Sequence, residues 1–282
     1  MKDSPKKDDV LKAKIDLHTV LASTYETDQP HYLPENKASV SARLACCAST
    51  SGNNVLIDLG CGTGFIINLA LPLYNVIFGA DITPAMLSKV DVSSEKVTLL
   101  QTSTENIPLN DNIANTITAN SFLHHLYDIR PTIAEAYRLL KNGGVFCSEE
   151  DPNAYFWESM KSLSECSGGV KHSYSDILSR ELSSTLKVDK EIETLKGVDA
   201  QVVQIAEYQK MIKGGMRSEK IEAIFKEIGF SKVNVEYYWF LGQAKITHQF
   251  SSKVSENIES YLRLVLPLSK HLFKYFRVEA WK

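Results

Sequence analysis

The stretch NVLIDLGCGTGF, Asn54–Phe65, gives the clearest indication of how this 282-residue chain folds. Its first half, 55–59, is an apolar run of strand length that a single acid interrupts. Near-continuous apolar runs are typical of strands buried in a parallel sheet. Glycine then stands at every other position, and apolar residues at helical spacing resume at Phe65. A glycine-rich turn from strand to helix lets the backbone approach a ligand closely, because no Cβ stands in the way. The stretch therefore predicts a strand, a ligand-binding turn and a helix.

A second strand is expected in the segment NVIFGA, 75–80, and Asp81 stands at its end. An acid at the tip of the second strand of such a unit is placed to bond both hydroxyls of a ribose. A dinucleotide fingerprint of the GxGxxG type requires glycine where this chain has Phe65, so a dinucleotide is the weaker interpretation. Two interpretations stay open at this point: a nucleoside-binding turn, or a glycine turn that serves only strand–helix packing.

The segments DLGCGTG, 58–64, and GADITPAML, 79–87, together resemble the nucleoside-binding half of class I S-adenosylmethionine-dependent methyltransferases of the small-molecule type. The resemblance implies an α/β fold with a Rossmann-like, doubly wound, mostly parallel seven-stranded sheet, a helical N-terminal lid and helical cap insertions. It implies S-adenosyl-L-methionine as cofactor and S-adenosyl-L-homocysteine as product. The cofactor-binding residues that it implies are Tyr25, Asp58, Gly60, Cys61, Gly62, Gly64, Asp81, Ile82, Met86, Ser103, Thr104 and Asn120.

The same resemblance assigns several of these residues to specific groups of the cofactor. The bend at 60–62 lines the methionine end of the cofactor, and Asp81 binds the ribose. Ile82 and Met86 lie against the adenine. Asp58 orients the turn or reaches the ammonium group of the cofactor through water.

The loop 101–108 corresponds to the adenine-binding stretch of the family, which usually carries aspartate where this chain has Ser103. A serine hydroxyl can accept one hydrogen bond, and the backbone of Thr104 can donate another. Asn120 ends the expected fourth strand, and the resemblance implies that it lies beside the methionine part of the cofactor.

Strand and helix patterns alternate along the chain, which predicts a doubly wound parallel sheet. The expected strands are 55–59, 76–80, 97–101, 116–120, 145–148, 232–238 and 276–281. The expected helices are 6–22, 36–51, 62–71, 84–90, 130–140, 155–163, 174–186, 219–228 and 254–275. The order of these elements predicts lid helices at 1–50, a cofactor-binding core at 51–150, a helical cap at 151–216 and a sheet-completing part at 217–282.

The segment 25–34 contains two prolines, which disfavour a helix there. In the family that the chain resembles, an N-terminal helix and loop fold over the cofactor as a lid and often contribute a tyrosine. Tyr25, His31 and Tyr32 are therefore the lid candidates. The alternative is that these aromatic rings only anchor a surface loop.

Methyl transfer from a sulfonium is an in-line displacement, for which alignment of the reactants can supply about 7–11 kcal/mol. A general base adds roughly 10²–10⁴-fold, so it helps but is not required. His124 and His125 follow the fourth strand near the expected methyl position, and we predict that they are catalytic. The alternative is that they pack against the sheet. The candidate substrate contacts are Tyr32, Glu149, Asp151 and Asn153, and we expect no metal site.

The composition disfavours nucleic-acid and membrane partners. A formal net charge of −3 gives no basic footprint, which disfavours a nucleic-acid substrate. The charged N-terminus is not a secretory signal, and no apolar stretch is long enough to span a bilayer. Five cysteines without metal-ligand spacing indicate free thiols in a reducing cytoplasm. The apolar segment 261–268 has basic neighbours, so it either binds a membrane surface or, as we expect, packs against the cap.

The expected function is methylation of a small-molecule metabolite on oxygen, nitrogen or carbon, by in-line transfer that depends mainly on positioning. No NPPY-like tetrapeptide follows the fourth strand, where base-modifying relatives carry one. Two alternatives remain: an enzyme that binds the cofactor but runs a reaction other than methylation, and a regulatory protein that binds it without turnover.

Overall fold

The computed structural model describes residues 4–166, 176–183 and 196–282. Its centre is one seven-stranded sheet in the order β3-β2-β1-β4-β5-β7-β6. Every neighbouring pair from β3 to β5 is parallel, and β7 runs antiparallel to both β5 and β6. The strands are β1 (Val55–Leu59), β2 (Val76–Asp81), β3 (Val97–Gln101), β4 (Ala114–Asn120), β5 (Leu140–Pro152), β6 (Lys232–Phe240) and β7 (Phe273–Trp281). The predicted doubly wound, mostly parallel sheet of seven strands is confirmed.

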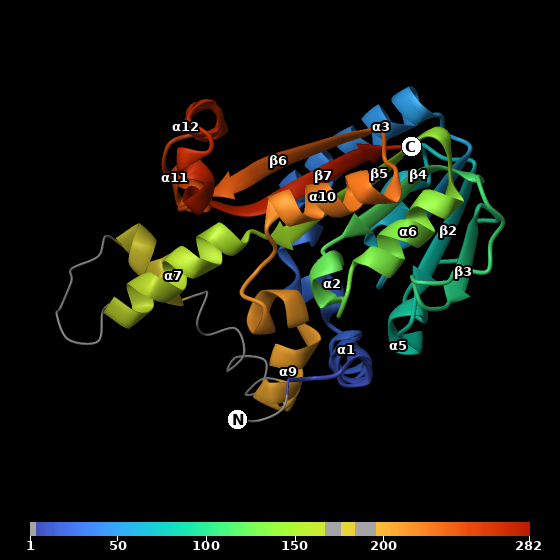
Figure 1. Cartoon of the computed structure of the whole chain (residues 1–282), viewed down its shortest axis with the longest axis horizontal. Helices are drawn as coiled ribbons and strands as arrows, with labels where there is room; N and C mark the ends of the chain where they lie inside the picture. Colours follow the sequence, from blue (N-terminus) through green and yellow to red (C-terminus); the bar gives the residue numbers. More distant parts are fainter. Residues whose placement is uncertain (1–3, 167–175, 184–195) are drawn as a thin grey trace.

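Helices cover both faces of this sheet (Figure 1). Among the described residues they are α1 (Lys7–Leu21), α2 (Tyr25–Asp28), α3 (Pro34–Ser51), α4 (Phe65–Ala70), α5 (Pro84–Leu87), α6 (Arg130–Leu139), α7 (Ala154–Cys166), α9 (Ala200–Ala206), α10 (Ser218–Ile228), α11 (Gln243–Gln249) and α12 (Ser252–Leu264). Short 3₁₀ segments lie at η1 (Pro30–Tyr32), η2 (Leu123–His125) and η4 (Leu268–Leu272), and η3 (Tyr208–Ile212) is a π-helix.

Two separate apolar layers hold the sheet between these helices. On one face, α6 and α10 bury Ile133 and Phe225 against sheet residues such as Ile117. On the other face, α3 and α4 bury Leu44 and Ile67 against the sheet. The continuous apolar pattern of the central strands is explained by this double cover, because both of their faces are out of water.

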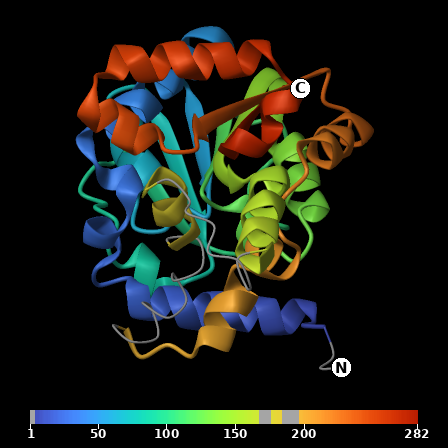
Figure 2. The ribbon, with the colours of Figure 1, turned by 90° about the vertical axis from the view of Figure 1, so that its left-hand side faces the viewer.

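The N-terminal helix α1 lies beside α9 in both views (Figures 1 and 2). Their contact buries Ala13 and Leu17 of α1 against Val203 and Ala206 of α9, and Met86 of α5 belongs to the same apolar cluster. Segments from the first tenth of the chain and from the insertion after β5 therefore pack together near one end of the central strands. The predicted division into lid, core, cap and closing part stays a prediction.

Several boundaries differ from those expected. Residues 25–28 and 30–32 form helical turns, although two prolines disfavoured helix there. The reason is position: Pro30 is the first residue of η1 and Pro34 is the first residue of α3, where the missing N–H has no helical partner to lose. Strand β5 runs on to Pro152 through a register shift between Ser148 and Asp151. Helix α5 is a single turn, and the predicted helix 174–186 lies partly outside the described residues.

The expected helix 254–275 is wrong in its second half. Helix α12 ends at Leu264, and β7 already begins at Phe273. Pro267 follows shortly after α12 and cannot donate a helical hydrogen bond. A further helix, α11, precedes α12 and was not predicted.

The expected burial of the segment 261–268 is also wrong. Tyr261 is 63% exposed, Leu264 is 84% exposed and Leu268 is 87% exposed. Helix α12 instead packs on the core with Ile258 and Leu262, which lie on its other side. No helix among the described residues has the length and apolar character needed to cross a bilayer.

The described cysteines, Cys46, Cys47, Cys61 and Cys147, are free thiols. Helix α3 brings Cys47 beside Cys147 of β5, with the two Sγ atoms 3.2 Å apart.

Candidate functional site

The glycine bend between β1 and α4 holds the backbone in a left-handed conformation. Gly60 has φ +66° and Gly62 has φ +52°. The N–H groups of Gly60 and Cys61 both donate to the carbonyl of Ala80, at 2.8 and 3.1 Å, which ties the bend to the end of β2. A Cβ on Gly60 would stand 2.0 Å from the ring of Phe122, whereas a Cβ on Gly62 would meet no atom within 4 Å. Gly60 is therefore required for packing, and Gly62 faces open space.

Asp81 lies directly beside this bend. One carboxylate oxygen accepts the N–H of Gly62 at 3.0 Å, and the other accepts the N–H of Thr83 at 2.8 Å. The residue that ends the second strand and the bend that follows the first strand are thus joined by a hydrogen bond. This arrangement holds a carboxylate at the edge of the open space that Gly62 leaves.

The open space continues as a cleft that is partly open to solvent. The predicted cofactor residues that line it are Tyr25, Gly60, Gly62, Asp81, Ile82, Met86, Ser103, Thr104 and Asn120. Asp58 and Cys61 line a smaller adjoining hollow together with Tyr32, and Gly64 lines neither, because it caps α4 and faces Val90.

Helix α1 supplies lining residues that the sequence did not single out. Lys7, Lys14 and His18 of this helix face the cleft. Burial lowers the pKa of Lys14, against the opposing charges of Asp81 and Glu105. Nothing in the amphipathic pattern of α1 distinguished these positions from other polar positions of the helix.

Asn120 is a buried polar group that lacks a partner. Its Oδ1 atom is shielded from solvent and makes no hydrogen bond within the described parts of the chain. The residue borders both the cleft and the adjoining hollow. A buried acceptor without a partner costs free energy unless a ligand or water bonds it. The open position at Gly62, the carboxylate of Asp81 and this unpaired acceptor fit an amino-acid-bearing nucleoside such as S-adenosylmethionine.

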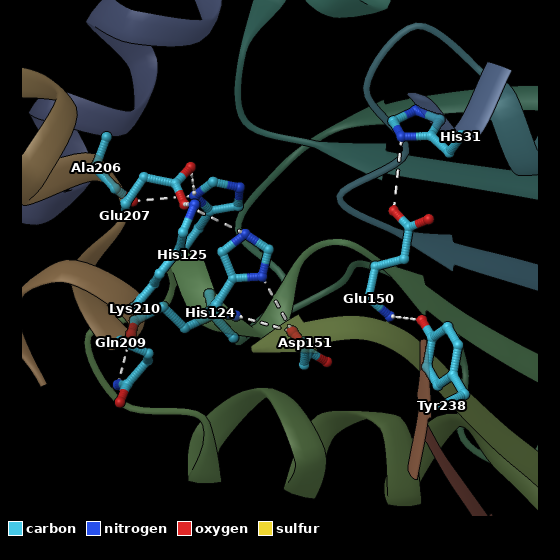
Figure 3. Close-up of polar contacts among 11 residues, drawn as sticks. His31, His124, His125, Glu150, Asp151, Ala206, Glu207, Gln209, Lys210 and Tyr238 are labelled. Carbon is cyan, nitrogen blue, oxygen red and sulfur yellow. Dashed lines mark hydrogen bonds and ion pairs between the residues drawn. The ribbon is translucent and has the colours of Figure 1, made fainter. Parts of the chain in front are cut away.

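A cluster of two histidines and two carboxylates lies next to the cleft (Figure 3). His124 Nδ1 lies 3.1 Å from Asp151 Oδ1, and its Nε2 lies 3.7 Å from Glu207 Oε2. His125 Nδ1 lies 3.0 Å from the carbonyl oxygen of Ala206 and 3.6 Å from Glu207 Oε1. The predicted residues His124, His125 and Asp151 are thus brought together, and Glu207 joins them from the segment after α9.

The charges of this cluster follow from its burial. Burial lowers the pKa of His125 well below its usual value, so its ring is neutral near pH 7. Burial raises the pKa of Asp151, and the contacts with His124 oppose that shift. Burial also disfavours ionisation of Glu207, but the charges of Lys210, His125, His124 and His18 together outweigh it and lower the pKa of Glu207.

Comparison with known proteins agrees with this geometry. Residues 57–148 match the family model described as a methyltransferase domain. A probable S-adenosylmethionine-dependent methyltransferase of Mycolicibacterium smegmatis is 27% identical over 96 residues, which are 34% of this chain and 37% of that protein. The match therefore spans a little over a third of the length of that relative.

By its sequence, the segment 57–148 is a methyltransferase domain.

Solved structures of the same fold extend the likeness beyond this segment. Phosphoethanolamine N-methyltransferase 2 of Haemonchus contortus, in complex with phosphomonomethylethanolamine and S-adenosylhomocysteine, superimposes with a TM-score of 0.57 at 15% identity. That alignment covers 100% of this chain and 61% of the other. An S-adenosylmethionine-dependent methyltransferase of Mesorhizobium loti gives a TM-score of 0.52 at 15% identity, over 86% of this chain and 96% of the other. At these identities the likeness shows the fold.

The segment 25–32, predicted to be a lid, lies against the glycine bend. The hydroxyl of Tyr32 bonds Thr63 Oγ1 at 2.6 Å, and its ring meets Phe65 edge-on. The ring of Tyr25 lies 5.9 Å from that of His31, and Tyr25 lines the cleft. Burial lowers the pKa of His31 to about 4 and raises that of Tyr32 to about 12, so both are neutral near pH 7.

The three acids that end β5 have separate surroundings. Both carboxylate oxygens of Glu149 bond the guanidinium group of Arg43 on α3. Glu150 was not predicted; it has φ +63°, and its carboxylate lies 3.6 Å from His31 Nδ1. Burial, with a contribution from Glu149, raises the pKa of Glu150 to about 8. Among the described residues no lysine or arginine pairs with Glu150.

Asn153, a predicted substrate contact, is fully buried. Its amide group donates to the carbonyls of Lys270 and Phe273, and its Oδ1 accepts the N–H of Tyr155. These bonds join the end of β5 to α7, to η4 and to the first residue of β7. Asn153 therefore serves to connect these segments and does not border the cleft.

Proposed function

We propose that this chain transfers a methyl group from S-adenosylmethionine to a small-molecule acceptor. The observation that carries the proposal is the carboxylate of Asp81, which lies 3.0 Å from the Gly62 N–H at the edge of the open cleft. When bound, the cofactor supplies a methyl group already activated on a sulfonium. The residues of this chain then have to hold two reactants in line.

Different residues of the cleft are assigned to the three main groups of the cofactor. We assign the ribose to Asp81, the adenine to Ile82 and Met86, and the methionine end to the bend at 60–62 and Asn120. Charge-assisted hydrogen bonds such as those to Asp81 are about twice as strong as neutral ones. Alignment of this kind can supply roughly 7–11 kcal/mol of the barrier.

We place the acceptor between the lid residues Tyr25 and Tyr32 and the side that holds His125. Helices α1 and α9 and the segment 25–32 pack around this region, and such a covered space suits a small metabolite. The Haemonchus protein of the same fold is named for the small molecule that it methylates. The net charge of −3 gives no support to a nucleic-acid acceptor.

We also propose that the histidine cluster contacts the polar atom of the acceptor. His125 borders the cleft, and His124 lies behind it with its ring fixed by Asp151. The acceptor atom, whether oxygen, nitrogen or carbon, is left open by this assignment.

The test is incubation of the purified chain with methyl-labelled S-adenosylmethionine and a fractionated metabolite extract. We expect label to enter a small-molecule fraction together with release of S-adenosylhomocysteine. The Asp81→Ala variant should lose this transfer, whereas Asp91→Ala, which alters an exposed acid outside the cleft, should keep it. Cofactor binding without label in any fraction would overturn the proposed activity.

A further inference from the structure

We propose that His124, His125 and Glu207 bind a divalent transition-metal ion, for which Zn²⁺ is the natural probe. Each residue offers one ligand atom, and these atoms all lie within 4.8 Å of one another. No local sequence pattern indicates this metal site, because Glu207 is far along the chain from the two histidines. The proposal goes beyond methyl transfer and does not depend on it.

The spacing of the ligand atoms suits an ion better than direct hydrogen bonds. Glu207 presents one carboxylate oxygen to each ring, at 3.7 Å from His124 Nε2 and 3.6 Å from His125 Nδ1. These separations are too long for hydrogen bonds. Zinc lies about 2.0–2.2 Å from nitrogen and oxygen ligands, which places two ligands of a tetrahedral ion roughly 3.3–3.5 Å apart. A small inward movement of the three side chains is therefore enough.

Asp151 fixes the tautomer that His124 needs as a ligand. It is fully buried, and its Oδ1 lies 3.1 Å from His124 Nδ1 and 3.2 Å from the His124 backbone N–H. A carboxylate at Nδ1 holds the ring proton there and leaves the Nε2 lone pair directed to the opposite side, where Glu207 lies. Metal-binding histidines almost always have such a partner on the other ring nitrogen.

His125 is the second histidine ligand, and its buried ring faces the same carboxylate, that of Glu207. Its Nδ1 atom also lies 3.0 Å from the carbonyl oxygen of Ala206. Binding an ion through Nδ1 requires the ring proton to reside on Nε2, and the Ala206 carbonyl is then placed to complete the coordination as a fourth ligand.

Charge and donor type narrow the choice of ion. The cluster holds two carboxylates, Asp151 and Glu207, against one ammonium group, that of Lys210, 3.4 Å from Glu207. Two imidazoles and one carboxylate suit zinc, iron(II), cobalt(II) or nickel(II), whereas magnesium and calcium prefer oxygen ligands. Lys210 competes with an ion for Glu207, and its ammonium group lies 5.3 Å from the ring centre of Trp157, where it can remain when Glu207 turns to the ion.

The π-helix η3, Tyr208–Ile212, begins immediately after Glu207. Such segments are rare and are frequent at functional sites. Because His125 also borders the cofactor cleft, an ion held by this cluster would lie beside the proposed acceptor.

The test uses the full chain, treated with a chelator and then titrated with Zn²⁺ by calorimetry and with Co²⁺ by absorption spectroscopy. We expect one ion per chain and cobalt bands typical of a low-coordinate nitrogen and oxygen site. Glu207→Gln and His124→Gln should each weaken Zn²⁺ binding at least tenfold. Asp151→Asn should weaken Zn²⁺ binding about 10–100-fold, because loss of the group that hydrogen-bonds a metal ligand typically has an effect of this size.

The Lys210→Met variant separates a metal site from a structural ion pair. Removing the competing ammonium group should tighten Zn²⁺ binding, whereas a cluster that serves only packing gains no affinity from this change. His271→Ala, which removes a histidine bonded to Ser159 instead, is the matched control and should leave the affinity unchanged. Mg²⁺ in place of Zn²⁺ should produce no comparable heat.

Circular dichroism and S-adenosylmethionine binding, measured on every variant, show that the chain is folded. Absence of Zn²⁺ binding by a folded, cofactor-binding chain overturns the metal site alone, and so does Zn²⁺ binding that survives Glu207→Gln. Zn²⁺ binding by a chain that takes no cofactor overturns the proposed methyl transfer alone.

Discussion

Asp81 acts through two hydrogen bonds that fix its carboxylate where the bend ends. Gly62 and Thr83 each donate a backbone N–H to it. Removing the carboxylate in Asp81→Ala should raise the dissociation constant for S-adenosylmethionine about tenfold to a hundredfold, because charge-assisted bonds are worth about 1.5–3 kcal/mol. Isothermal titration calorimetry measures this directly.

Asp91 provides the control for this prediction. It also accepts the N–H of the residue two positions on, Ser93, but it is exposed and does not line the cleft. Asp91→Ala should leave cofactor binding unchanged. Equal effects of the two substitutions would show that Asp81 has only the local turn-forming role that Asp91 has.

Asp58 gives a prediction about pH. Its side chain is 2% exposed and accepts a hydrogen bond from Thr118 Oγ1 at 2.7 Å. Burial raises its pKa from 3.8 to about 7 in the folded chain. A carboxyl whose pKa is higher in the folded state contributes stability that is fully present below pH 3.8 and is lost as the pH rises to about 7.

Asp58→Asn removes this titration and keeps an oxygen for Thr118. The free energy of unfolding of the variant, relative to the native chain, should therefore be higher at about pH 8 than at about pH 4. Urea unfolding at the two pH values gives the comparison. A difference that is the same at both would mean that Asp58 does not carry the proton.

At the scale of the element, two glycines of the bend between β1 and α4 have different roles. Gly60 is required for packing, and Gly62 borders the space assigned to the cofactor. Alanine at either Gly60 or Gly62 costs about 1–2 kcal/mol, because both have positive φ. Only Gly60→Ala adds a collision, with the ring of Phe122, and overpacking costs about 1–3 kcal/mol more. Gly60→Ala should therefore lower the melting temperature further than Gly62→Ala.

Gly62→Ala, the variant with the smaller loss of stability, should have the larger loss of cofactor binding. The Cβ of Gly62→Ala enters the open space that we assign to the cofactor. The melting temperature of this variant should respond much less to added S-adenosylmethionine than that of the native chain, although the variant stays folded. A full thermal response in Gly62→Ala would place the cofactor elsewhere in the cleft.

Elements of this kind were predictable because their signals are local. The strand β1, the bend and Asp81 can be read from adjacent residues, and the alternation of strands and helices follows from apolar spacing. Glu207 was missed because it reaches His124 only through the packing of α9 on α1. Glu150 was missed because its direction depends on the register shift in β5, which no local pattern announces.

At the scale of the whole molecule, segments that are far apart in the sequence pack together beside the cleft, whereas apolar side chains at the end of α12 and just after it stay exposed to solvent. The insertion after β5 contributes α9 and Glu207, and the N-terminus contributes α1 and the lid. The closing part contributes α12, whose apolar residues are divided between core and solvent. A hydrophobic pattern at helical spacing predicted burial but not which side of α12 would receive it.

The difference between exposed and buried leucines can be measured by replacing leucine with alanine at three positions. Leu264→Ala and Leu268→Ala should each change the free energy of unfolding by no more than about 0.5 kcal/mol, because both side chains are more than 80% exposed. Leu139→Ala on α6, where the side chain is fully buried, should cost about 2–5 kcal/mol. Chemical denaturation of the three variants decides the matter. A loss above about 1 kcal/mol at Leu264 or Leu268 would mean that these side chains are covered in solution, since an exposed leucine has no buried contacts to lose.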